Sequence, residues 1–273
     1  MPATYGSPIH IVSTVAGKIS YTVNGNYLHR FKKFDGTLDI FHIGQEQSTW
    51  TPVSFPDNVD AVMRRSSATS FFYSPRHQFT NLVMANTNAQ GILENTSKLL
   101  NDDVDAALPD RGEDGSVFYS NGDADNFALF FRQQPRRIPT GNIVMDKSLF
   151  MVSLGYRGSL YWFTNEDDLV LHRLDSTTGN HIRNEIKFDE YVKNGKYRGM
   201  NLVPNGMGKL VIAFSAKLFI IDPETLAWDT EPLGVGSYRI VGAMAEGHLI
   251  ATRTTEDNKD VIIVKLSLLS DQM

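Results

Sequence analysis

Short apolar segments alternate with polar turns along the whole chain. The segments are rich in Val, Ile, Phe, Tyr and Thr, and Gly, Asn, Asp and Pro separate them. β-Branched and aromatic runs bounded by turn residues are typical of strands. Helical periodicity is almost absent, and only Ile92–Ala107 has a composition that indicates a short helix or a structured loop. The pattern therefore predicts an all-β protein.

Three stretches of the chain share one pattern, in which a short apolar strand is followed by an Asp-led turn and a second strand. They are Tyr27–Leu38, Val170–Gly179 and Leu218–Leu226. The turn residues Asp175 and Asp222 lie about one repeat apart. A repeat of ~45 residues built from short strands is the sequence signature of a β-propeller.

The strands fall into six groups, so we expect a six-bladed β-propeller of antiparallel sheets with three or four strands each, in one domain over residues 1–273. Five blades with a long insertion is the alternative. In either case we expect an irregular, acidic insertion around residues 92–115, exposed to solvent. The expected groups are Ile9–Thr14, Lys18–Val23, Tyr27–Phe31 and Leu38–Ile43; Val59–Arg64, Thr69–Tyr73, Phe79–Met84 and Gly91–Asn95; Ser116–Tyr119, Phe127–Arg132 and Asn142–Met145; Leu149–Leu154, Ser159–Phe163, Leu169–Leu174 and His181–Lys187; Met200–Val203, Leu210–Phe214, Leu218–Ile221 and Leu226–Asp229; Tyr238–Ala243, His248–Thr252 and Val261–Leu266.

The sixth group lacks a fourth strand before the chain ends. Propellers often close their ring by pairing strands from the two termini, which removes an exposed sheet edge. Residues near Ala3–Ile11 could supply the missing outer strand, and this would change the strand count of the first group. Otherwise the last blade has three strands and a neighbouring molecule covers its edge.

Composition narrows the classes of protein that the chain can belong to. The net charge of −5 argues against nucleic-acid binding through a broad basic face, and the absence of Cys excludes disulfides and thiolate chemistry. The first residues have neither the basic start nor the apolar stretch of a signal peptide. The apolar runs are too short to span a bilayer. We therefore expect synthesis in a cytoplasm without a membrane span, compatible with incorporation into a virion.

The polar residues show no complete catalytic or metal-binding motif. No two of the seven His residues have the helical spacing of a zinc pair, and His29 and His172 occupy equivalent repeat positions, which favours a shared structural role. Asn121–Asn126 resembles the start of a calcium loop, but Asn126 stands where Gly is required and Arg132 where a bidentate Glu is required. We therefore predict no catalytic residue, no metal and no cofactor.

Arg137-Ile138-Pro139 resembles part of the Arg-Ile-Pro motif of sialidases, which are six-bladed propellers. The resemblance implies an arginine that grips a substrate carboxylate through a bidentate contact. Sialidases also repeat a box of the form Ser-x-Asp-x-Gly-x-Thr-Trp. The nearest stretch, Gln47–Trp50, lacks its Asp and Gly.

Positive charge is concentrated in the first half of the chain, where the repeat is least regular. Arg, Trp and Tyr are the residue types that most often anchor protein interfaces. Alternation along Ser159–Phe163 points one of Tyr161 and Trp162 into the core, and we place Trp162 there. The predicted binding residues are Arg64, Arg65, Arg76, Arg132, Arg136, Arg137 and Trp50.

Two functions follow from these observations. The first is a non-enzymatic interaction module, a subunit of a larger assembly such as a virus or phage particle, with other protein subunits and copies of itself as partners. At fold level the chain looks like a free-standing relative of the propeller modules in phage tail nozzle proteins. The second is a sialidase-like propeller glycoside hydrolase, which would need paired carboxylates at the central channel.

Overall fold

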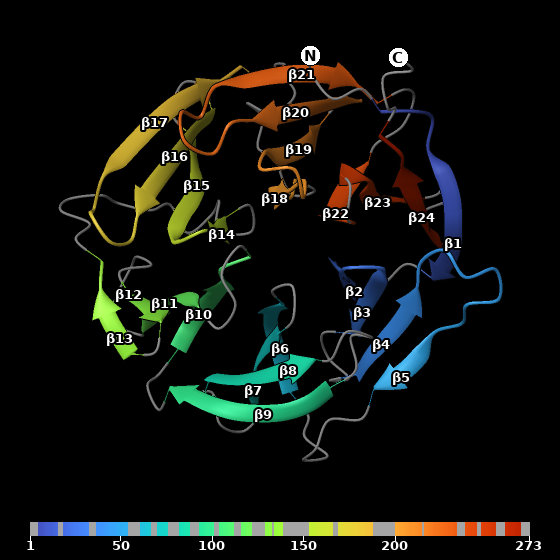
Figure 1. Ribbon diagram of the computed structural model, residues 1–273, viewed down its shortest axis with the longest axis horizontal. Helices are drawn as coiled ribbons and strands as arrows, with labels where there is room; N and C mark the ends of the chain where they lie inside the picture. Colours follow the sequence, from blue (N-terminus) through green and yellow to red (C-terminus); the bar gives the residue numbers. More distant parts are fainter. Residues whose placement is uncertain are drawn as a thin grey trace. The chain divides into compact units, whose positions relative to one another are not determined.

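The computed structural model describes residues 5–15, 19–32, 37–53, 61–66, 70–75, 82–87, 93–100, 104–111, 116–121, 129–132, 134–138, 153–165, 169–187, 200–214, 216–233, 238–244, 247–254 and 260–268. Within these ranges the strands pair into six four-stranded sheets (Figure 1). The strands within these sheets pair antiparallel, and an isolated bridge between Asp110 and Gly155 is parallel. The fold is an all-β antiparallel β-propeller, as the repeat predicts.

Five of the sheets are built from strands that are consecutive along the chain. They comprise β2 (Ile19–Asn24), β3 (Tyr27–Lys32), β4 (Thr37–His42) and β5 (Thr51–Val53); β6 (Ala61–Ser66), β7 (Ser70–Pro75), β8 (Leu82–Thr87) and β9 (Leu93–Leu100); β10 (Val104–Pro109), β11 (Val117–Asn121), β12 (Leu129–Arg132) and β13 (Gln134–Arg137); β14 (Leu154–Tyr156), β15 (Ser159–Asn165), β16 (Leu169–Asp175) and β17 (His181–Ile186); β18 (Val203–Pro204), β19 (Leu210–Phe214), β20 (Lys217–Ile221) and β21 (Trp228–Pro232). The sixth sheet joins β22 (Arg239–Ala243), β23 (Leu249–Thr254) and β24 (Asp260–Leu266) to β1 (Ile9–Val15).

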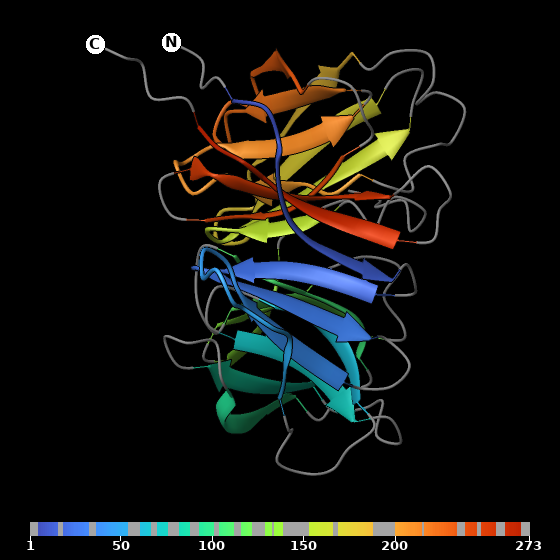
Figure 2. The ribbon, with the colours of Figure 1, turned by 90° about the vertical axis from the view of Figure 1, so that its right-hand side faces the viewer.

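The N-terminal strand closes the last sheet, and the expected first group is therefore wrong. β1 pairs with β24 in the register Thr14↔Val261 and does not pair with the strand that follows it. Figure 2 shows β1, in dark blue, running along the red C-terminal strands. A further bridge joins Tyr5 to Leu268. The outer-strand alternative is the one that the structure supports, and the strand extends to Val15.

The helix or loop expected over Ile92–Ala107 is wrong as well. β9 and β10 occupy this stretch, so the expected irregular insertion around 92–115 is largely sheet. β9 pairs with β8 and β10 pairs with β11 over their lengths. Pairing in a sheet overrides local helical preference, because it satisfies the backbone and packs side chains against neighbouring strands. The expected strand over Asn142–Met145 lies outside the described residues.

Burial follows the position of a strand in its sheet. Most residues of β4 and of β19 are buried, which is the pattern of strands covered on both faces. The last strand of a sheet is different: β21 has no buried residue, and β17 has one. Apolar runs in the sequence therefore mark interior strands, and mixed polar runs mark the outer strands, which are harder to find from sequence.

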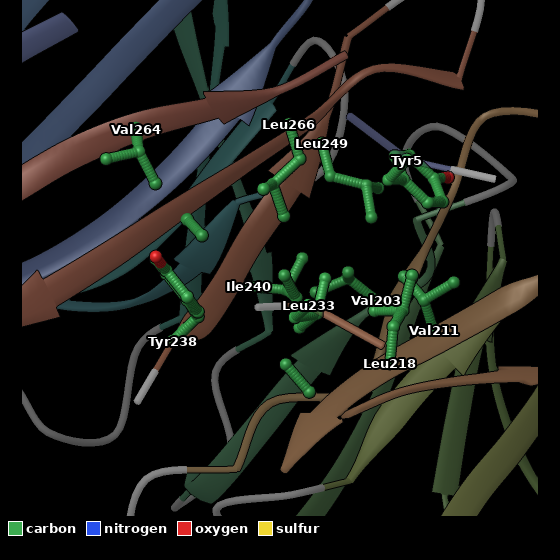
Figure 3. Packing of buried hydrophobic residues seen from close by; sticks show 12 residues of the cluster. Tyr5, Val203, Val211, Leu218, Leu233, Tyr238, Ile240, Leu249, Val264 and Leu266 are labelled. Atoms are coloured by element: carbon green, nitrogen blue, oxygen red, sulfur yellow. The ribbon is translucent and has the colours of Figure 1, made fainter. Parts of the chain in front are cut away.

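The chain divides into two compact units by contact density. One unit comprises Met1–Gly17, Phe163–Leu171 and Ile182–Met273. Its core gathers side chains of β18, β19, β20, β22, β23 and β24 together with Tyr5, and Figure 3 shows Leu218 and Leu249 converging on one apolar volume. Burial of each such side chain stabilises the fold by ~1.5–3 kcal/mol.

The other unit comprises Lys18–Trp162 and His172–His181. Its core includes Phe118, Leu160 and Trp162. Trp162 is 1% exposed, which confirms its predicted core position, and Tyr161 is equally buried. Neighbouring side chains of a strand point to opposite faces of its sheet, so both faces of β15 are covered at this position.

The Asp-led turns of the repeat are built alike. Oδ1 of Asp175 accepts hydrogen bonds from the backbone N–H of Thr177 and Thr178 and from the hydroxyl of Thr178. Oδ1 of Asp222 accepts the equivalent three bonds from Glu224 and Thr225. These Asp residues start turns, as predicted from the repeat.

Candidate functional site

The structure describes six of the seven predicted binding residues, and these six belong to three sheets. Arg64 and Arg65 lie on β6, next to a register shift in its pairing with β7. In the next sheet along the chain, Arg132 ends β12, and Arg136 and Arg137 lie on the neighbouring strand β13. Arg76 lies outside the described residues. A binding role for these seven residues stays a prediction.

Trp50 lies between β4 and β5 and packs against its own sheet. The Arg30 guanidinium lies 4.1 Å from the centre of its ring and forms an ion pair of 2.7 Å with Asp39. Phe41 and Tyr21 contact other parts of the indole, with ring centres 5.3 and 6.5 Å away. Trp50 is therefore half-buried and stabilises the sheet; its role in binding stays a prediction.

Arg137 of the sialidase-like tripeptide lies on β13, the edge strand opposite to β10 in its sheet. Ile138 beside it is buried in the apolar core of its unit. The resemblance places an arginine where substrate is gripped. A position at a sheet edge next to a core residue gives no support to that role.

A connection between the ends of β10 and β14 forms the best-defined polar site. Asp110 and Gly155 make a parallel bridge, and the backbone N–H of Arg111 donates to the carbonyl oxygen of Gly155 over 2.9 Å. The Asp110 carboxylate is completely buried and accepts hydrogen bonds from the next turn. Its Oδ1 binds the N–H of Arg157 at 2.7 Å, and its Oδ2 binds the N–H of Gly158 at 2.5 Å. We call Asp110, Arg111, Tyr156, Arg157 and Gly158 the arginine turn.

The backbone at Arg157 is held in an uncommon conformation. Arg157 has φ of 49° and Gly158 has φ of 72°, between Tyr156 and Ser159, which are paired across the hairpin. A two-residue turn with both φ values positive matches the twist of the strands, but a side chain in this region costs about 1–2 kcal/mol. Charge-assisted hydrogen bonds from the turn to Asp110 offset this cost. The buried carboxylate therefore fixes a strained turn.

The side chain of Arg157 points to solvent from this fixed backbone. Arg157 is exposed, and its guanidinium carbon lies 5.1 Å from the centre of the Tyr156 ring. A guanidinium stacked on an aromatic ring keeps its N–H groups available for an anion. The result is a rigid, positively charged contact point.

The charges of the arginine turn give it a net positive balance. Burial raises the pKa of Tyr156; the positive charge of Arg157 opposes this rise and the negative charge of Asp110 adds to it. Burial lowers the pKa of Arg111 to about 10, although part of this residue is exposed. Both arginines are therefore cations at neutral pH, and Tyr156 is uncharged. One carboxylate, already engaged by backbone N–H groups, stands against two guanidinium groups.

Sequence reasoning missed this site. The Arg-Gly dipeptide at 157 and 158 joins two strands through a two-residue turn, and this is the signal that could have marked Arg157. Asp110 had no such signal, because its partners lie 47 and 48 residues further along the chain.

No group of three or more His, Asp or Glu side chains in the part of the chain that the structure describes could hold a metal ion. Residues 122–126 of the calcium-like loop are not among the described ones. A search for a membrane-spanning helix likewise finds none there.

Comparisons with known proteins support the fold class. A Bacteroides fragilis protein described as exported superposes with a TM-score of 0.54 at 8% identity, covering 98% of this chain and 95% of that one. The protein YjhT superposes with a TM-score of 0.50 at 10% identity and covers 97% of both chains. No protein-family model and no curated protein matches the sequence. The chain is a β-propeller protein, and identities this low show the fold alone.

Proposed function

We propose that the chain is a non-enzymatic interaction module that docks a protein partner through the arginine turn. In this proposal each of the six sheets is one blade of a six-bladed ring, which forms a rigid scaffold for the turns at its ends. The observation that carries the proposal is the buried Asp110 carboxylate, which holds the exposed Arg157 in a left-handed conformation. Strain that is maintained at an exposed side chain is typical of functional positions.

The charge of the site defines the partner that it fits. Arg157 is exposed, Arg111 is a cation that burial destabilises, and the Asp110 carboxylate is occupied by backbone N–H groups. A carboxylate of the partner would pair with the Arg157 guanidinium through charge-assisted hydrogen bonds. The partner is therefore a protein with an acidic segment. Its identity as another subunit of a virus or phage particle, and the formation of a homo-oligomer, stay predictions.

Replacing Arg157 with Gly separates docking from folding. Gly adopts positive φ without steric cost, so R157G keeps the turn and retains or raises stability by up to ~1 kcal/mol while it removes the guanidinium. We expect R157G to bind the partner at least tenfold more weakly. Stability by urea unfolding and affinity by calorimetry measure the two effects separately.

A photoreactive amino acid at position 157 identifies the partner in the native cell. The matched control carries the probe at Thr177, an exposed turn residue of the same unit. We expect a defined adduct at position 157 that is absent at position 177, with the crosslinked peptide rich in Asp or Glu. Equal adducts at both positions, or an R157G variant with unchanged affinity, contradict the docking proposal. Hydrolysis of a sialoside by the purified chain would establish the glycosidase instead.

A further inference from the structure

Three aromatic rings with nearly parallel planes lie on adjacent strands of one sheet. Trp162 belongs to β15, His172 to β16, and His181 is the first residue of β17. The two imidazoles are inclined by only 3°, with centres 5.2 Å apart, and Nδ1 of His172 is hydrogen-bonded to Nε2 of His181 over 3.0 Å. The Trp162 indole is parallel to both, with centres 4.9 and 5.6 Å away.

The pair is largely removed from solvent. His172 is 6% exposed and Trp162 is 1% exposed, whereas His181 is partly exposed. Trp162 belongs to the same core as Leu174 and Phe118. Electrostatic interactions in such surroundings are stronger than in water, so the protonation state of the imidazoles has a large effect on the contact.

A hydrogen bond between two imidazoles depends on the number of protons that they carry. A neutral imidazole has one N–H donor and one acceptor nitrogen, whereas an imidazolium has two donors and no acceptor. The bond between His172 and His181 therefore forms when both rings are neutral or when one is protonated. When both are protonated, two N–H groups and two positive charges face each other across 3.0 Å, and the contact is lost.

We propose that His172 and His181 form an acid-sensitive latch that holds the start of β17 to β16. An imidazole in an unfolded chain takes up its proton near pH 6.5. At lower pH the unfolded chain carries two protons at these positions and the latched pair carries one at most. Because the unfolded state then binds more protons, stability falls as the pH falls. The latch opens on acidification and frees the beginning of an outer strand.

Charged residues of both signs lie near the pair on β16, on β17 and in the turn between them. Arg173 follows His172 and donates from Nε to the hydroxyl of Ser159, and Asp175 begins the turn that leads to His181. Arg183 and Glu185 are exposed and lie at alternate positions of β17, on the same face of the strand as His181. Among these described residues, two arginines and two carboxylates offset each other, so the repulsion between two imidazolium groups is what opposes the second proton.

Urea unfolding between pH 7.5 and 5.0 tests the latch, with H181Q as the test variant. The Gln oxygen accepts a hydrogen bond from a protonated His172, so H181Q keeps the contact but removes the conflict between two cations. From pH 6.5 to 5.5 we expect the unfolding equilibrium constant of the wild-type chain to rise about fivefold more than that of H181Q, because the additional imidazole of the unfolded chain is half protonated at the start of this range. The matched control is H10Q, because His10 is exposed and its ring is hydrogen-bonded to the hydroxyl of Ser13 and not to another imidazole. H10Q keeps the wild-type pH dependence. Equal pH slopes for the wild type and H181Q overturn the proposal.

Direct titration of the imidazoles decides the question if H181Q does not fold. Long-range nitrogen–proton NMR spectra of the wild-type chain report the protonation of each ring. We expect one ring of the pair to stay neutral at pH 5.5. Independent protonation of His172 and His181 near pH 6.5, without loss of their contact, overturns the latch.

Discussion

Carboxylates at defined positions fix the backbone of several turns. Asp175 and Asp222 each accept three hydrogen bonds within their own turn, whereas Asp110 accepts N–H groups of a different hairpin. The first arrangement is local and recurs with the repeat. The second joins β10 to β14 and carries the arginine turn.

Replacing Asp110 with Ala removes both hydrogen bonds that hold the turn at Arg157. Bonds to a charged acceptor contribute about 1.5–3 kcal/mol each, and the two N–H groups lose their partner in a buried place. We expect D110A to lower the free energy of unfolding by about 2–5 kcal/mol in urea titrations. D110N should lose less, because one amide oxygen still accepts. The control D229A, at an exposed residue of β21, should stay within about 0.5 kcal/mol of the wild type, and an equal loss in D229A and D110A contradicts the role of the clamp.

Asp222 links stability to pH in the acid range. Its hydrogen bond of 2.6 Å to Nζ of Lys209, followed by the N–H of Thr225, holds the pKa of this carboxyl well below its usual value. A carboxyl with a lowered pKa in the folded state contributes stability above its ordinary pKa and loses it as the pH falls through the folded value. Between pH 4 and 2 the unfolding free energy should therefore fall less steeply in D222N than in the wild type. Parallel curves in chemical unfolding over this range would rule out the contribution.

At the scale of elements, the last sheet is closed by β1, a strand from the opposite end of the chain. β1 covers the edge of β24 and leads from Tyr5, whose hydroxyl donates to the carbonyl oxygen of Gly247. Burial raises the pKa of Tyr5 to about 12, so this donor stays protonated over the physiological range. An uncovered strand edge is a template for aggregation.

Removing residues 1–15 should therefore destabilise the chain and expose the edge of β24. The loss of a buried Tyr and of a strand corresponds to about 3 kcal/mol or more, or a fall in Tm of roughly 6–12 °C. Calorimetry and size-exclusion chromatography measure the fall and the expected association of the shortened chain. A chain without residues 1–4 keeps Tyr5 and β1 and serves as the control. A monomeric chain with wild-type Tm after the longer truncation would show that β1 is dispensable.

At the scale of the whole molecule, each of the two compact units is assembled from segments that are distant in the sequence. One unit comprises three separate segments and the other comprises two. Neither unit is therefore a continuous stretch of the chain. The chain should behave as one cooperative domain, which is the prediction made from its repeat.

Tryptophan fluorescence and circular dichroism test whether the chain unfolds as one cooperative domain. The W228F variant leaves Trp50 and Trp162, which both lie in one unit, while far-UV dichroism follows all strands. We expect the thermal midpoints of the two signals to coincide within about 1 °C, as in a two-state transition. Two separated midpoints would show that the units unfold independently.

The sequence by itself determined the features that depend on neighbouring residues. Alternation and β-branched runs predicted most strands of the regular groups, the repeat predicted the propeller, and the Asp-led turns were predicted because their hydrogen bonds close within three residues. Trp162 was placed in the core by alternation alone. Local geometry carries this information because strand period and turn chemistry are set over a few bonds.

Only the tertiary structure decided what depends on distant contacts. These features are the pairing of β1 with β24, the strands β9 and β10 in place of a short helix or structured loop, and the hydrogen bonds from the Arg157 turn to Asp110. The first and the last join segments that are distant in the sequence, and no local pattern identifies their partners. The predicted arginines were chosen by charge density along the chain, whereas the arginine turn is defined by a buried carboxylate from another sheet. Sheet pairing and burial are decided by the whole packed chain, since the free energy of each contact exists only when both partners are in place.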